Sequence, residues 1–260
     1  MADRLPSFLQ ALRARRALQR WRQAAQAGAE MSAGDLAEIA PIARDMASQA
    51  SSIVRAADRR LRVPRIGNDT IDRPAQCDWA WRATPWAAAL CPATIAGATG
   101  GTQLAEGVRL FHDCPLSEIT LRQTLATSPA ARAPYVLSLD ALGFEGSFLS
   151  LAMDLPKEGA TTLTRSHIVI LTTKMWMERP AEIFARLNIR QGPNTEQLVS
   201  ELKPGDRPDS PVVAEFDLGF HDINPAKLET AWIDLIFDKP AMNLVRIEDF
   251  TVTRRPRAEL

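Results

Sequence analysis

Four tryptophans and one aspartate are the side chains of this sequence best suited to hold a ligand. Exposed aromatic rings beside polar groups can recognise sugars, because the ring covers apolar C–H faces while the polar groups bond the hydroxyls. Trp79 and Trp81 share one face if their segment is extended, and Trp232 alternates with Asp234 along a polar strand face. Trp176 completes the set. The competing interpretation is that these tryptophans seal the core at sheet edges.

Carboxylates offer a second chemistry, the hydrolysis of a glycosidic bond, which needs two facing Asp or Glu side chains. Asp217 could face Asp234 or Glu248 across strands of a sandwich. The alternative is that these acids form the solvated face of alternating strands. A carbohydrate-active enzyme therefore stays an open alternative, and no residue is assigned a catalytic role.

Motifs for metals, cofactors and nucleophiles are missing from the sequence. Cys77, Cys91 and Cys114 have no CxxC spacing, and the three histidines are far apart. HExxH and GxSxG motifs are absent, and the glycine-rich run at 97–102 lacks the lysine of a phosphate-binding loop. We expect reduced thiols, no metal site and no cofactor.

Short segments of alternating or continuous apolar character fill residues 107–260, and turn residues separate most of them. They are 108–111, 118–125, 135–142, 147–155, 164–177, 182–190, 212–220, 230–238 and 245–254. Strands at this spacing, without helices between them, favour an antiparallel β-sandwich of jelly-roll type. Residues 64–106, rich in Pro and Gly, are expected to be an irregular, Trp-containing connector packed on the sandwich.

Residues 1–63 have a helical pattern and a strong positive charge. Within 1–65 there are 12 Arg against 6 acidic residues, and the rest of the chain carries the compensating negative charge. The pattern predicts two helices, the first ending near Gly28 and the second beginning near 32–35 and stopping before Pro64. The apolar stripe of the first helix weakens past Leu12, because Arg16 falls on the same face.

The basic arm is predicted to mediate attachment or assembly through side chains of one short segment. These are Arg13, Arg15, Arg16, Arg20, Trp21 and Arg22. An anionic membrane surface, docking on the acidic β-domain or on a protein partner, and homo-oligomerisation through the helices all remain open. Nucleic acid is not expected, because the arm has few stacking aromatics and the β-domain is acidic. The start of the sequence lacks the apolar run of a secretory signal, so we expect a cytoplasmic protein, either free or peripheral to a membrane.

Two resemblances follow from particular segments. The closing strands, Trp232–Asp238 and Val245–Thr253, resemble the last strands of carbohydrate-binding jelly rolls. Trp79–Arg82 and Arg109–Pro115 are similar to an uncharacterised alphaproteobacterial family of unknown function, which implies no activity. Together these observations favour a non-enzymatic binding or scaffold protein whose sandwich recognises a glycan or a protein partner.

Overall fold

The structure, a computed structural model, describes residues 8–28, 30–61, 70–203 and 210–257. The chain divides into two compact units between Ile53 and Val54, and each unit is described by itself. Neither of the long helices, over its described residues, has an apolar stretch of the length that a bilayer crossing requires.

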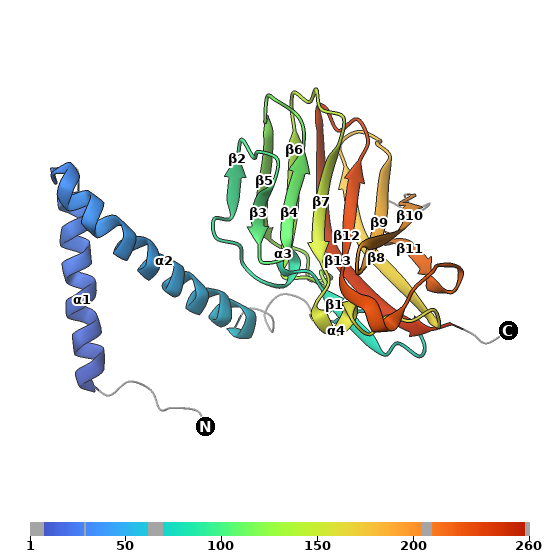
Figure 1. Cartoon of the computed structure of the whole chain (residues 1–260). Coiled ribbons are helices and arrows are strands. Elements are labelled where there is room, and N and C mark those ends of the chain that lie inside the picture. The colour runs from blue at the N-terminus through green and yellow to red at the C-terminus, as the bar shows by residue number, and fades with distance from the viewer. Residues whose placement is uncertain (1–7, 29, 62–69, 204–209, 258–260) are drawn as a thin grey trace. The chain divides into compact units, whose positions relative to one another are not determined.

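The first unit is helical, as the sequence predicts (Figure 1). Helix α1 spans Phe8–Ala27 and ends just before Gly28, and α2 spans Ala33–Leu61. The Ser32 hydroxyl begins α2, because it accepts a hydrogen bond from the backbone N–H of Asp35 at 3.2 Å and donates one to the Asp35 carboxylate at 2.7 Å. Pro64, which was expected to stop this helix, lies outside the described residues.

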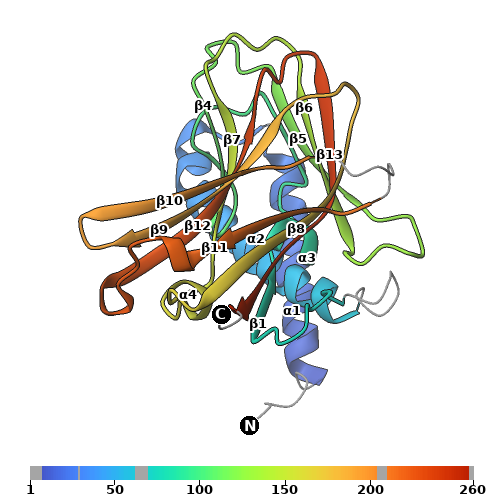
Figure 2. The same cartoon turned by 90° about the vertical axis from the view of Figure 1, so that its right-hand side faces the viewer.

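The second unit holds two antiparallel sheets, which confirms the predicted β-sandwich preceded by two helices (Figure 1). The seven-stranded sheet has the order β11 (Val212–Asp217), β8 (His167–Met177), β13 (Asn243–Pro256), β6 (Tyr135–Ala141), β5 (Ile119–Leu125), β2 (Thr94–Ala96), with β1 (Trp79–Arg82) also paired to β13. The six-stranded sheet has the order β10 (Asn194–Glu201), β9 (Ile183–Gln191), β12 (Leu228–Phe237), β7 (Leu149–Asp154), β4 (Val108–His112), β3 (Thr102–Ala105). Figure 2 shows β10, β9 and β12 side by side.

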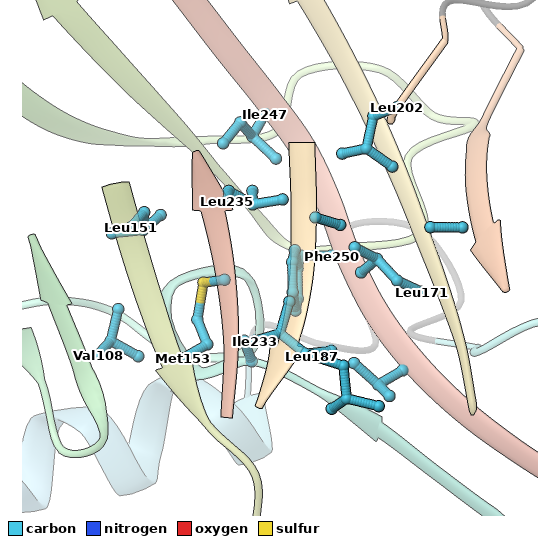
Figure 3. Packing of buried hydrophobic residues seen from close by; sticks show 14 of the residues in the cluster. Val108, Leu151, Met153, Leu171, Leu187, Leu202, Ile233, Leu235, Ile247 and Phe250 are labelled. Atoms are coloured by element: carbon cyan, nitrogen blue, oxygen red, sulfur yellow. The ribbon is translucent and has the colours of Figure 1, made fainter. Parts of the chain in front are cut away.

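The core lies between the two sheets, because every second residue of their strands points inward. From the six-stranded sheet, Leu151, Ile233 and Leu235 enter it, and Leu171 and Phe250 enter from the seven-stranded sheet (Figure 3). The opposite face of each sheet carries the polar half of the alternation. A ligand site on this domain therefore has to use an outer face or a loop.

Three local predictions were wrong. The connector at 64–106 is not irregular throughout: over its described part it supplies β1, β2, β3 and the short helix α3 (Thr84–Ala87). The segment 194–201, in which no strand was predicted, forms β10. The predicted strand at 212–220 ends at Asp217, because the Asp217 carboxylate accepts a hydrogen bond from the backbone N–H of Gly219 at 2.9 Å and starts the 3-10 turn η2 (Leu218–Phe220).

The remaining elements are the short helix α4 (Lys157–Ala160) and the 3-10 turn η3 (Pro225–Lys227).

Trp86 in α3 anchors the connector segment that precedes β4 in the hydrophobic core. Its side chain is fully buried, its ring stacks on Phe250 with centroids 5.3 Å apart, and its indole N–H donates to the carbonyl of Ile247 at 2.9 Å. Gln123 of β5 accepts the N–H of Leu90 and donates to the carbonyls of Pro85 and Ala88. The segment is thus held by both apolar and polar contacts.

Asp78 and Arg254 fix the start of β1 against β13. The two side chains form paired hydrogen bonds of 3.0 and 2.9 Å. Partial burial by itself would raise the pKa of the Asp78 carboxyl, but the hydrogen bonds and charge of Arg254 outweigh it and hold that pKa below its ordinary value.

We predict that Trp86→Ala lowers the free energy of unfolding by about 3–5 kcal/mol, because it leaves a large cavity and an unpaired carbonyl. Urea unfolding of the variant and of Trp176→Ala, in which the replaced ring is half-exposed, measures the difference. A loss at Trp86 no larger than the loss at Trp176 would contradict the assignment of Trp86 to the core.

We predict that Asp78→Asn destabilises the protein at neutral pH and that the difference from the parent protein disappears in acid. Above about pH 4 the carboxylate is ionised in both the folded and the unfolded protein, so the ion pair contributes fully. As the pH falls through the lower, folded-state pKa, the carboxylate is protonated and the contribution is lost. Urea midpoints measured across the acid range test this, and a difference that persists unchanged into strong acid would refute it.

Candidate functional site

The structure distributes the predicted ligand residues over different faces. Trp79 and Trp81 do share one side of β1, but they lie opposite Arg254 and Val252, on the side of β13 that faces inward. Both rings are half-buried against the core, and Trp79 is so close to α4 that a Cβ on Gly159 would lie 2.3 Å from its ring. They do not form an exposed platform.

Trp232 and Asp234 lie on the outer face of the six-stranded sheet. Trp232 is half-buried, and Asp234 is only 4% exposed. Arg186 donates to the Asp234 carboxylate at 3.0 and 2.8 Å, and the Asn188 side-chain amide donates at 2.9 Å. Asp234 therefore stabilises the pairing of β9 with β12, and its carboxylate is committed to these partners.

The candidate catalytic pair is not assembled. Asp234 belongs to one sheet, whereas Asp217 and Glu248 belong to the other. Within that sheet Asp217 pairs with Ile168, near the start of β8, whereas Glu248 lies beside Lys174, six residues further along β8. Burial opposes ionisation of Asp217, but the N–H of Gly219 and the guanidinium of Arg257 outweigh this effect and keep the pKa of Asp217 below its ordinary value. Asp217 caps a turn and anchors Arg257, which is a structural role.

A cavity of about 230 Å³ opens on the outer face of the seven-stranded sheet. Its floor comes from β6, β8 and β13, through Val136, Thr172 and Thr251, and the β5–β6 loop at 126–132 forms one wall. Among the described residues, the cavity brings together polar side chains from segments far apart in the sequence. It is the place at which we locate a candidate binding site.

A β-bulge in β13 places two consecutive carboxylates at this cavity. The pairing of β13 with β8 shifts between Ile247 and Asp249, so that Glu248 is an extra residue. In a regular strand one of two neighbouring side chains would point into the core. Here both Glu248 and Asp249 line the cavity, while Ile247 and Phe250 on either side stay in the core.

Cations engage both carboxylates. Arg82 of β1 donates to Asp249 through Nε at 2.8 Å and Nη2 at 3.1 Å, which is the bidentate geometry of a strong ion pair. The Lys174 ammonium lies 3.1 Å from Glu248, and the Arg246 guanidinium lies 3.6 Å from it. A separate ion pair, between Arg132 and Asp72, is also found at the cavity.

Trp176 lies beside this cavity on the same outer face. It is the direct cross-strand partner of Arg246, and it is two residues from Lys174 along β8. Its side chain is 48% exposed. Trp176 is thus the predicted ligand residue that the fold places beside a cavity, with an aromatic ring open to solvent.

Most of the cavity residues were missed from the sequence. Lys174, Arg246 and Asp249 carry no motif, and the wall at 126–132 has the composition of an ordinary turn. One signal was available: the apolar residues Val245, Ile247, Phe250 and Val252 change phase by one position after 247, which indicates a bulge. No group of three or more potential metal ligands occurs among the described residues.

Several solved structures resemble part of this chain, with low TM-scores. The enzymatically active domain of tailspike protein 4 of bacteriophage CBA120 is 8% identical with a TM-score of 0.40, and the match covers 62% of this chain and 21% of that one. A family 11 carbohydrate-binding module from Clostridium thermocellum, in complex with a β-1,3-1,4-mixed-linked tetrasaccharide, is 9% identical with a TM-score of 0.38, covering 63% of this chain and 99% of the module. The CBM22-2 xylan-binding domain from Paenibacillus barcinonensis Xyn10C is 11% identical with a TM-score of 0.37, covering 59% and 93%.

These TM-scores assign neither a ligand nor an activity to this chain. No curated protein sequence matches the chain. An alphaproteobacterial origin stays a prediction. One family matches the whole sequence, residues 1–260, and the chain belongs to it: Family of unknown function (DUF6478).

Proposed function

We propose that this protein is a non-catalytic glycan-binding protein, and that the ligand lies on the outer face of the seven-stranded sheet. The observation that carries this proposal is the cavity of about 230 Å³ with a half-exposed tryptophan beside it. A sugar ring stacks on an aromatic face, while its hydroxyls need hydrogen-bond donors and acceptors close by.

The charges at the cavity favour an uncharged glycan. Its lining holds three cations and three carboxylates, and Arg82 adds a fourth cation, which pairs with Asp249. Each carboxylate has a cation as a neighbour, and a set of charges so close to balance attracts neither anionic nor cationic ligands strongly over distance. Each ion pair still presents carboxylate lone pairs and N–H groups, and these are the two kinds of partner that a hydroxyl group uses.

The same ion pairs argue against glycosidic hydrolysis. A glycosidase needs one carboxyl group that keeps a proton to protonate the leaving group. Arg82 donates two hydrogen bonds to Asp249. Lys174 and Arg246 lie beside the Glu248 carboxylate. Both carboxylates are thus already engaged by cations of the protein itself, so this site suits binding.

We predict that the parent protein binds a neutral polysaccharide and that Trp176→Ala weakens this binding about tenfold, as expected for the loss of one stacking ring. Mixed-linked β-glucan and xylan, named for the two modules above, are the first probes, with affinity electrophoresis as the measurement. The matched control is Phe111→Ala, because Phe111 is 37% exposed on the outer face of the other sheet. Equal losses in both variants, or no binding to any neutral polysaccharide, would refute the proposal.

We predict that Ala130→Trp abolishes binding without changing the free energy of unfolding. Ala130 is an exposed residue of the cavity wall, so a large side chain there fills the cavity without disturbing the core. Calorimetric titration with the polysaccharide that binds best tests this, and the same samples show whether reducing ends are released. Unchanged affinity would move the site away from the cavity, and Trp176-dependent release of reducing ends would favour the enzyme instead.

A further inference from the structure

Positive charge is more concentrated in helix α1 than in the rest of the chain. Its 20 residues contain five arginines and no acidic residue. Four of them have described side chains, Arg15, Arg16, Arg20 and Arg22, and all four are exposed. A helix of this composition gains nothing from internal ion pairs, and its charge is available to a partner.

The same helix carries an apolar stripe that the sequence pattern alone obscured. Since α1 continues without a break to Ala27, residues three and four apart lie together on its surface. From residue 17 onward, the apolar positions that share this face are Ala17, Leu18, Trp21 and Ala25. Leu18 is 53% exposed and Trp21 is half-buried, so part of this stripe meets solvent.

The arginines border this stripe on both sides. Arg15 and Arg22 are three and four residues from Leu18, and Arg20 is three residues from Ala17. Long arginine side chains in such flanking positions can extend away from an apolar face and keep the guanidinium groups at the level of lipid headgroups. A narrow apolar stripe between two basic borders is the pattern of a helix that lies in a membrane interface.

We infer that α1 binds anionic lipid surfaces, lying flat with the Leu18 stripe toward the acyl chains and the arginines on the phosphates. Charge complementarity selects this occupant, and the apolar stripe distinguishes it from nucleic acid, which would engage the arginines and leave the stripe in water. Since no described helix has the length and apolarity to cross a bilayer, the attachment is peripheral. The inference is independent of the glycan site.

The test is co-sedimentation of the full-length protein with vesicles of equal parts phosphatidylglycerol and phosphatidylcholine, and with vesicles of phosphatidylcholine alone. We expect binding to the anionic vesicles only, weakened by added salt. The double substitution Arg15→Gln, Arg22→Gln should lower the partition coefficient roughly 30-fold, from two headgroup contacts. The matched control Arg15→Lys, Arg22→Lys keeps the charge and should retain binding.

Further variants distinguish binding to anionic lipid from binding to other partners. Leu18→Gln should also weaken vesicle binding, whereas Trp176→Ala should not change it. Circular dichroism confirms that the variants keep their helices. Equal binding to neutral vesicles, no binding to anionic ones, or arginine-dependent binding of double-stranded DNA or of a second protein copy in place of vesicles would overturn the inference.

Discussion

Strand β13 is the element on which the sandwich and its candidate site both depend. It pairs with β8 over most of its length, with β6 over Asn243–Ile247 and with β1 over Thr251–Arg254. Arg254 secures that last pairing from β13 itself, through Asp78. The bulge at Glu248 bends the strand at the point where these partners change, and it shifts the alternation so that core residues continue on both sides of it.

The bulge also explains why a polar cavity forms on a sheet face. Two adjacent carboxylates in a strand repel each other and cost solvation energy unless cations compensate them. Arg82 comes from β1, Lys174 from β8, and Arg246 from β13 itself, so the compensation requires three strands to be in register. The cavity is therefore a consequence of sheet assembly, and Trp176 lies at its margin because β8 continues past the bulge.

Glycan binding and lipid binding, as proposed, use different parts of the chain and different physical forces. The cavity holds paired charges of both signs on a sheet face, which suits short-range hydrogen bonding and ring stacking. Helix α1 holds unbalanced charge and an apolar stripe, which suits long-range attraction to a surface followed by shallow insertion. A protein with both features would hold a glycan close to a membrane.

The sequence by itself determined the class of fold, the two helices, the position of most strands and the separation of charge between them. These properties are local, because apolar periodicity and turn residues act over a few positions. It also named Trp176 among four candidate tryptophans, and the role of Trp176 in binding stays a prediction. The tertiary structure alone decided that Trp79 and Trp81 face inward. It also decided that the Asp234 carboxylate accepts hydrogen bonds from Arg186 and Asn188. Finally, it brought Lys174, Arg246 and Asp249 together at one cavity. Such outcomes depend on which strands pair and in which register, and those pairings are set by packing between residues far apart in the sequence.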